Sequence, residues 1–338
     1  MQFLKMLFAA IVLMATSANA QTPHLTRDIN TTFLNGYPTA QCAVNGYLYF
    51  NGTNVSSGTE LWRSDGTTAG TKLFADIVKG TTSSDPVALT KVGNTLFFIA
   101  TTAEFGRELW KLDSGASAPV MVKDIRTGYG NSGVVGLFAY KNKLYFSAGA
   151  STSGDYELYT SDGTDTGTYM VKDINPGTAN SQPYLFTICK DILYFVATSS
   201  TSGQELWRTD GTANGTYLVK DIYPGTSGSS ISSLAAYKDT LYFNASCPGT
   251  PSTYLGLWKS DGTDTGTQKV ASATATTYSS VDYLTVCNNW LYFSAYNATV
   301  GQELFRTNGK YVYLVKDIDP GNTGSAPMSL VTVDTILY

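Results

Sequence analysis

Histidine is nearly absent from this sequence, and the absence narrows the chemistry that the chain can perform. The 338 residues include one histidine, His24. The sequence contains no nucleophile elbow, no phosphate-cradling glycine loop and no His/Cys spacing of a metal site. Most Asp and Glu residues fall at repeated positions. We therefore predict no catalytic residue, no metal ligand and no cofactor, with a two-carboxylate glycoside hydrolase as the alternative.

Charge and long apolar runs are also scarce. Only 14% of the residues are charged and the formal net charge is −4, so no basic surface favours nucleic acid. The apolar run Met6–Met14 is far shorter than the roughly 20 residues that cross a bilayer. It follows Lys5 and precedes Ala18-Asn19-Ala20, the pattern of a secretory signal peptide. We predict a signal peptide at 1–20, no membrane insertion after its cleavage, and a secreted or cell-surface protein.

Helical periodicity is missing after the signal, whereas tyrosine, threonine, serine and glycine are abundant. Such a composition favours short strands joined by turns. A motif typified by ELWRTDGTANGT from Glu205 recurs along the chain, and a Leu-Tyr-Phe motif keeps the same interval. The leucines of the first motif are 47 to 51 residues apart: Leu61, Leu109, Leu158, Leu206, Leu257 and Leu304. This regularity predicts a repeat of about 48 residues.

Each repeat is predicted to form four strands. In the fourth repeat these are Tyr184–Cys189, Ile192–Thr198, Glu205–Thr209 and Tyr217–Ile222, separated by turns rich in Asp and Gly. Four strands in 40 to 50 residues are typical of a β-propeller blade. We predict an all-β fold in which residues 21–338 form one propeller, with an open solenoid of sheets as the alternative.

The two ends of the sequence predict how the propeller closes. Leu25–Asn30 matches the fourth strand of a repeat, whereas Met328–Val333 and Thr335–Tyr338 match the first two strands. We predict a seven-bladed ring whose last blade is shared by the two ends, which would remove an exposed sheet edge. The final Leu-Tyr also suggests that roughly 20 further residues would complete this blade.

The repeat resembles that of bacterial exported proteins that carry the ELWxxDGT repeat, some of them described as hyalin-like. Residues 203–222 (GQELWRTDGTANGTYLVKDI) follow the consensus of that family almost throughout, and the resemblance covers nearly all of the chain after residue 20. It implies a propeller in secreted or surface proteins, with no established activity.

Three repeated features have both a structural and a functional interpretation. The Asp-Gly turns could bind calcium, but too few oxygen ligands follow, so we predict that each Asp caps its own turn. Glu205 and Lys220 are predicted to form a cross-strand ion pair. The tryptophans of the motif could stack on sugars, yet their recurrence once per repeat favours packing between blades.

Four cysteines remain after the signal, and we predict free thiols because three of them occupy similar places in different repeats. They are Cys42, Cys189, Cys247 and Cys287.

A ligand site is expected where one repeat departs from the others, and the fifth departs most. It has a longer loop, Gly256 in place of the usual glutamate, and three candidate ligand-binding residues, Tyr254, Tyr278 and Tyr283. We predict a non-catalytic interaction or adhesion scaffold whose partner is an extracellular protein or glycan. A lectin-like carbohydrate-binding propeller is the alternative.

Overall fold

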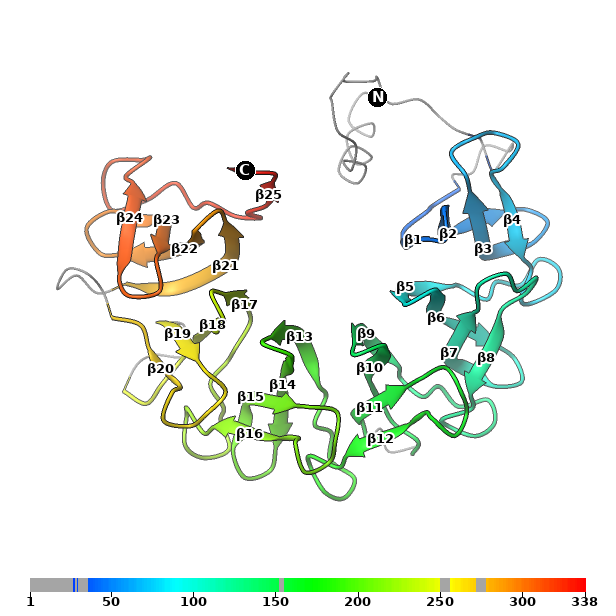
Figure 1. Cartoon of the computed structure of the whole chain (residues 1–338), viewed down its shortest axis with the longest axis horizontal. Coiled ribbons are helices and arrows are strands. Elements are labelled where there is room, and N and C mark those ends of the chain that lie inside the picture. The colour runs from blue at the N-terminus through cyan, green and yellow to red at the C-terminus, as the bar shows by residue number, and fades with distance from the viewer. Residues whose placement is uncertain (1–26, 28, 30–35, 152–154, 250–255, 272–277) are drawn as a thin grey trace.

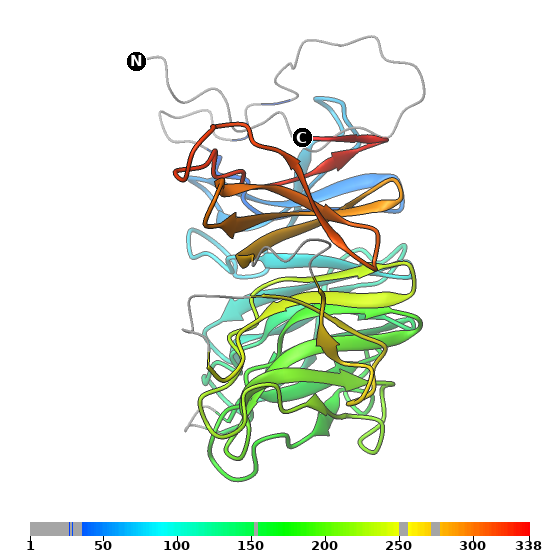
Figure 2. The same cartoon turned by 90° about the vertical axis from the view of Figure 1, so that its left-hand side faces the viewer.

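The strands of this protein form separate small sheets arranged around an open arc. The computed structural model describes residues 27, 29, 36–151, 155–249, 256–271 and 278–338. Within these residues there are six four-stranded antiparallel sheets, one two-stranded sheet and no helix. Figure 1 shows the sheets as blades around a centre, and Figure 2 shows the same blades from the side. The predicted propeller of four-stranded blades is therefore confirmed.

Each blade is a meander in which strands that follow one another in the sequence are also neighbours in the sheet. The first three blades consist of β1 (Gln41–Val44), β2 (Tyr47–Asn54), β3 (Gly58–Ser64) and β4 (Lys72–Ala75); β5 (Val87–Val92), β6 (Thr95–Thr102), β7 (Gly106–Leu112) and β8 (Val120–Lys123); and β9 (Val135–Tyr140), β10 (Lys143–Ala148), β11 (Glu157–Ser161) and β12 (Tyr169–Lys172). The next three consist of β13 (Tyr184–Cys189), β14 (Ile192–Ser199), β15 (Gly203–Thr209) and β16 (Tyr217–Lys220); β17 (Leu234–Tyr237), β18 (Thr240–Ala245), β19 (Gly256–Ser260) and β20 (Gln268–Lys269); and β21 (Ser279–Cys287), β22 (Trp290–Asn297), β23 (Gly301–Thr307) and β24 (Val312–Lys316). The strands predicted for the fourth repeat agree with β13 to β16 to within two residues.

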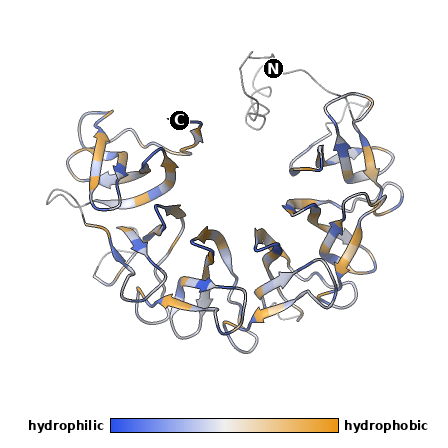
Figure 3. Ribbon diagram, viewed as in Figure 1, coloured by the Kyte–Doolittle hydropathy of each residue, from blue (hydrophilic) through white to orange (hydrophobic). Residues whose placement is uncertain are grey.

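The core lies between neighbouring blades, and hydrophobic segments recur in each of them (Figure 3). The Phe of the Leu-Tyr-Phe motif faces the preceding blade and is fully buried in five blades, at Phe98, Phe146, Phe195, Phe243 and Phe293. The aromatic residue of the ELW motif also packs on the preceding blade. Trp258, for example, stacks on Phe243 at 6.5 Å between ring centroids and shares a cluster with Leu206 of blade four. The prediction that these tryptophans pack between blades is confirmed.

The Asp-Gly turn is closed by its own side chains. In the fourth blade Asp210 Oδ1 accepts hydrogen bonds from Thr212 N and Thr212 Oγ1, both at 2.8 Å. Gly211 takes a φ of 101°, which suits glycine. A Cβ on Gly215 would lie 2.0 Å from Asp210 Oδ1, so the second glycine of the motif makes room for the carboxylate. These hydrogen bonds lower the pKa of Asp210. The predicted turn-capping role of this Asp is confirmed.

This capping role makes a testable prediction. Asp210→Ala should lower the free energy of unfolding by about 1 kcal/mol, because two turn donors lose their acceptor at an exposed site. Asp210→Asn keeps an oxygen acceptor and should remain close to the parent. Urea unfolding followed by tryptophan fluorescence measures both. If Asn were as damaging as Ala, the hydrogen bonds to Oδ1 would not be the cause.

The ends of the arc carry parts of a further blade. Arg27 donates from Nη1 to the carbonyl of Thr71, and Ile29 lies against Gly52 of blade one. Lys172, on the fourth strand of blade three, donates in the same way to the Thr216 carbonyl of blade four at 2.7 Å. Arg27 therefore makes the contact of a fourth strand, as its sequence predicted.

At the other end of the arc, β25 (Thr332–Val333) and β26 (Ile336–Leu337) pair with each other. In the described residues they pair with no other strand, so closure of the ring through a shared blade stays a prediction.

Candidate functional site

The glutamate of the ELW motif is a buried acceptor that fixes the link between blades. In the third blade Glu157 accepts from Ile174 N at 2.8 Å, from Ser181 N at 3.1 Å and from Ser181 Oγ at 2.5 Å. Its side chain is fully buried. Ile174 and Ser181 flank the segment that leads to the next blade. A carboxylate with several donors in one buried place therefore holds this crossover against its own blade.

The direction of the pKa shift of these glutamates depends on whether the next blade covers them. Burial, partly opposed by hydrogen bonds from Ser132 and Ser229, raises the pKa of Glu108 and of Glu205 to about 7. Burial also raises the pKa of Glu303 in the last complete blade, but hydrogen bonds from Ser325 and the nearby backbone outweigh it, so the net shift is downward.

The predicted ion pair between Glu205 and Lys220 is wrong. A register shift between Leu206 and Trp207 places Lys220 opposite Leu206. Lys220 Nζ then reaches the next blade, where it lies 3.2 Å from Asp264 Oδ1. The simple two-residue alternation used to pair the strands fails at this bulge.

The tyrosines expected to form a ligand site in the fifth repeat are not gathered in one place. Tyr254 lies outside the described residues. Tyr278 is buried, with its hydroxyl donating to Val270 O at 2.5 Å and its ring 6.4 Å from that of Phe293. Tyr283 lies on the innermost strand of blade six and is 40% exposed. Of the two described tyrosines, Tyr278 thus lies in the core and Tyr283 lies on the surface.

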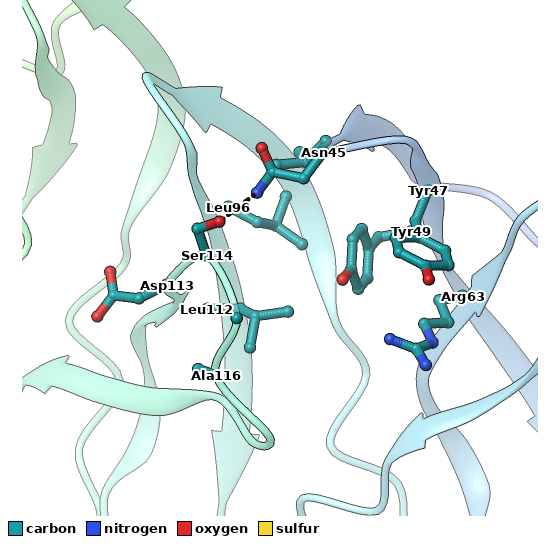
Figure 4. Close-up of a pocket in the computed structure, with 11 residues that line it drawn as sticks. Asn45, Tyr47, Tyr49, Arg63, Leu96, Leu112, Asp113, Ser114 and Ala116 are labelled. Atoms are coloured by element: carbon teal, nitrogen blue, oxygen red, sulfur yellow. Dashed lines mark hydrogen bonds between the residues drawn. The ribbon is translucent and has the colours of Figure 1, made fainter.

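A cavity of about 150 Å³ lies between blades one and two, and we name it the Arg63 pocket (Figure 4). Leu96 and Leu112 give it an apolar wall, and Tyr47, Tyr49 and Arg63 border it from blade one. Its remaining lining residues are Val44, Asn45, Asp113, Ser114, Gly115 and Ala116. Its volume resembles that of cavities that hold a benzene-sized group.

The polar groups of the pocket differ in how far they are engaged. Asp113 points away from Arg63 in Figure 4 and is paired with Lys111 at 2.6 Å, which lowers the pKa of Asp113. Asn45 Nδ2 donates to Ser114 Oγ at 3.2 Å. The guanidinium of Arg63 stacks 4.6 Å from the ring centroid of Tyr47. Its buried Nε has no hydrogen-bond partner among the described residues, as is also the case for Arg208 and Arg306. Arg63 is the one cationic side chain among the residues that line the pocket.

An equivalent arginine shows why this pocket is open. Arg208 in blade four donates from Nη1 to the carbonyl of Gly262 at 3.1 Å, in the Asp-Gly turn of the next blade. The corresponding turn of blade two reads Asp-Ser-Gly-Ala, with Ser114 in place of the glycine. Among the described residues, Arg63 makes no such hydrogen bond to the turn of the next blade. A repeat that departs from its siblings thus creates the pocket.

The sequence predicts a departure of this kind in the fifth repeat, whereas the pocket lies beside the altered turn of the second. The weak copy from Glu108 (ELWKLDSG) already showed the altered turn, and that was the available signal. The apposition of this turn to Arg63 of the preceding blade is a tertiary feature, which the spacing of the motif did not indicate.

Neither a protein-family model nor a curated protein sequence matches the chain. Solved structures that resemble it include puromycin hydrolase, at 11% identity over 89% of this chain and 49% of that one, with a TM-score of 0.46. A prolyl endopeptidase matches at 10% identity over 82% of this chain and 50% of that one, with a TM-score of 0.38. The chain spans about half the length of these two proteins.

A third match is the β-propeller domain of the Trilobed protease from Pyrococcus furiosus, described as having an open velcro topology. It is 9% identical over 82% of this chain and 84% of that domain, with a TM-score of 0.42. Likenesses at this level establish the fold alone.

These matches correct the prediction of a non-catalytic interaction or adhesion scaffold, together with its lectin alternative. The solved structures named here belong to peptidases, so the propeller fold does not separate this chain from enzymes. The scarcity of catalytic motifs in the sequence is therefore not evidence for a scaffold.

Among the described residues, His, Cys, Asp and Glu form no group of three that could hold a metal ion. The same part of the chain contains no helix long and apolar enough to cross a membrane.

Proposed function

We propose that this propeller recognises a small carboxylate ligand in the Arg63 pocket, with the terminal residue of a peptide as the class that it fits best. The observation that carries the proposal is the guanidinium of Arg63 on the lining of an apolar cavity, where it lacks the cross-blade hydrogen bond that Arg208 makes to Gly262. A guanidinium binds a carboxylate through charge-assisted hydrogen bonds, which are stronger than neutral ones.

The other walls of the pocket support the same ligand class. Leu96 and Leu112 would pack on an aliphatic or small aromatic side chain, and Ser114 lies across the cavity. The volume of about 150 Å³ fits one such side chain rather than a larger ligand. A free amino acid derivative or the last residue of a peptide combines these two features.

Binding of N-acetyl-leucine and of its carboxamide, measured by calorimetry, tests this proposal. The acid should bind, and Arg63→Gln should weaken it about tenfold or more, because one charge-assisted hydrogen bond is lost. Arg208→Gln is the matched control, since Arg208 already donates to Gly262, and it should leave binding unchanged. Equal binding of acid and carboxamide, or of parent and Arg63→Gln, would overturn the proposal.

A peptide ligand also calls for an assay of hydrolysis. Short peptides with a free C-terminus are incubated with the protein and followed by mass spectrometry, because the propellers named above come from peptidases. This readout is independent of the affinity measurement.

We also propose that the chain is exported and that its partner is extracellular. The pattern of residues 1–20 supports export, and the resemblance to the ELWxxDGT-repeat proteins agrees with it. Detection of the mature N-terminus in the culture medium of a producing cell would test this.

A further inference from the structure

The last residue of the innermost strand is buried at the junction with the next blade, and its size differs from blade to blade. In blades three and five this residue is Tyr140 and Tyr237, which are 3% and 4% exposed. In blade one it is Val44, which is equally buried and lines the Arg63 pocket. The pocket therefore lies where two other junctions carry a tyrosine ring.

The junction of blades three and four shows how such a ring is held. The ring of Tyr140 meets that of Tyr145 edge to face, with the ring centroids 5.4 Å apart. Both rings share a hydrophobic cluster with Leu193 of blade four. A similar arrangement recurs at the junction of blades five and six, with Tyr237, Tyr242 and Leu291. A second tyrosine of the preceding blade and a leucine of the next blade thus form the walls around the ring.

Each of these rings also has an acceptor for its hydroxyl group. Tyr140 donates to the carbonyl of Asp191, in the first turn of blade four. Blade five repeats this hydrogen bond, with Tyr237 and Asn289. The corresponding carbonyl in blade two belongs to Asn94, and Asn45 Nδ2 of the pocket donates to it at 3.0 Å. Since a carbonyl oxygen accepts two hydrogen bonds, Asn94 can also accept one from a phenol.

The walls around the ring are retained between blades one and two. Tyr49 stands at the position of Tyr145 and Leu96 at that of Leu193, and both line the Arg63 pocket (Figure 4). They share a hydrophobic cluster with Val44, the residue in place of Tyr140. The volume of about 150 Å³ is that of a cavity that holds one benzene-sized group. This junction thus keeps the walls and the hydroxyl acceptor but carries a valine where the other two carry the ring.

We propose that the Arg63 pocket takes a phenol ring, so that the peptide end it recognises is a C-terminal tyrosine. The ring occupies the place that Tyr140 fills at its own junction, packs on Tyr49 and Leu96, and donates from its hydroxyl to the carbonyl of Asn94. The carboxylate contact rests on the function proposed above for Arg63. The place for the ring is argued from the chain's other junctions and stands without that contact.

Calorimetry with matched ligands tests the ring and the carboxylate separately. N-acetyl-tyrosine should bind about tenfold more tightly than N-acetyl-leucine, because it adds an aromatic contact and a hydrogen bond. p-Cresol, which has no carboxylate, should also bind. Equal binding of the two acids, or no binding of p-cresol, would overturn the phenol proposal and leave the carboxylate proposal standing. Binding of p-cresol with no preference for acids over carboxamides would do the reverse.

Exchanging the two residue types between junctions assigns p-cresol binding to this place. Val44→Tyr gives blade one the ring of blades three and five, so p-cresol should bind at least tenfold more weakly. Val135→Tyr adds a tyrosine at a position that is 54% exposed on β9, and it should leave binding unchanged. Tyr140→Val opens the same place in blade three, so p-cresol should raise the melting temperature of this variant more than that of the parent. Undiminished binding by a folded Val44→Tyr protein, or no extra rise for Tyr140→Val, would overturn the proposal.

Discussion

Replacing Glu205 by alanine is expected to lower the free energy of unfolding by about 3 to 5 kcal/mol. The carboxylate accepts from Tyr223 N at 3.0 Å and from Ser229 Oγ at 2.7 Å, and both donors belong to the segment that leads to blade five. Loss of the acceptor leaves these groups unpaired in a place closed to water, at about 1 to 3 kcal/mol each. The cavity left by the side chain adds to the loss.

Urea unfolding of two further variants separates the causes of this loss. Glu205→Gln keeps one carbonyl acceptor and should lose less than Glu205→Ala. Glu303→Ala removes the equivalent glutamate beneath the uncovered face of blade six, where Ile318 is exposed and water can reach the freed donors. The loss of unfolding free energy in Glu303→Ala should be about half that in Glu205→Ala. Equal losses at Glu205 and Glu303 would show that covering by the next blade does not matter.

Raising the pH from 5 to 8 is expected to destabilise the fold by several kcal/mol. Burial raises the pKa of Glu108 and of Glu205 to about 7, above the ordinary value of 4.5. Because the folded state binds these protons more tightly than the unfolded state, protonation adds its full share to the free energy of unfolding below pH 4.5. This share falls between pH 4.5 and 7 and is lost above pH 7. Each group contributes about 3 kcal/mol to the fall.

The other repeated glutamates act in both directions. Burial also raises the pKa of Glu60 and Glu157, so they add to the decline with pH. The lowered pKa of Glu303 has the opposite sign, and its stabilising effect is lost only as the pH falls through the acid range. Above pH 5 the glutamates with a raised pKa therefore determine how the free energy of unfolding changes with pH.

Urea midpoints at half-unit intervals of pH measure this dependence. Glu205→Gln cannot titrate at that position and should flatten the curve between pH 5 and 7 relative to the parent. Asp210→Asn removes a carboxylate whose pKa is lowered, and it should leave that part of the curve unchanged. A parent protein that grows more stable from pH 5 to 8 would contradict the prediction.

The sequence by itself determined the architecture, because the repeated motifs encode local structure. The Leu-Tyr-Phe strand is a short apolar run that is buried along most of its length, and the Asp-Gly-Thr turn closes on its own side chains. Even the contact of Arg27 with blade one follows from the match of its segment to a fourth strand. Such features depend on residues close together in sequence or on a pattern repeated in every blade.

Tertiary structure alone decided the site and the roles of the charged residues. A bulge moved Lys220 away from Glu205, which left the glutamate to bind the crossover segment. The Arg63 pocket arises because the turn with Ser114 faces the preceding blade, about 50 residues away in sequence. Register shifts and contacts between blades depend on how whole sheets pack, so one repeat read alone does not contain them.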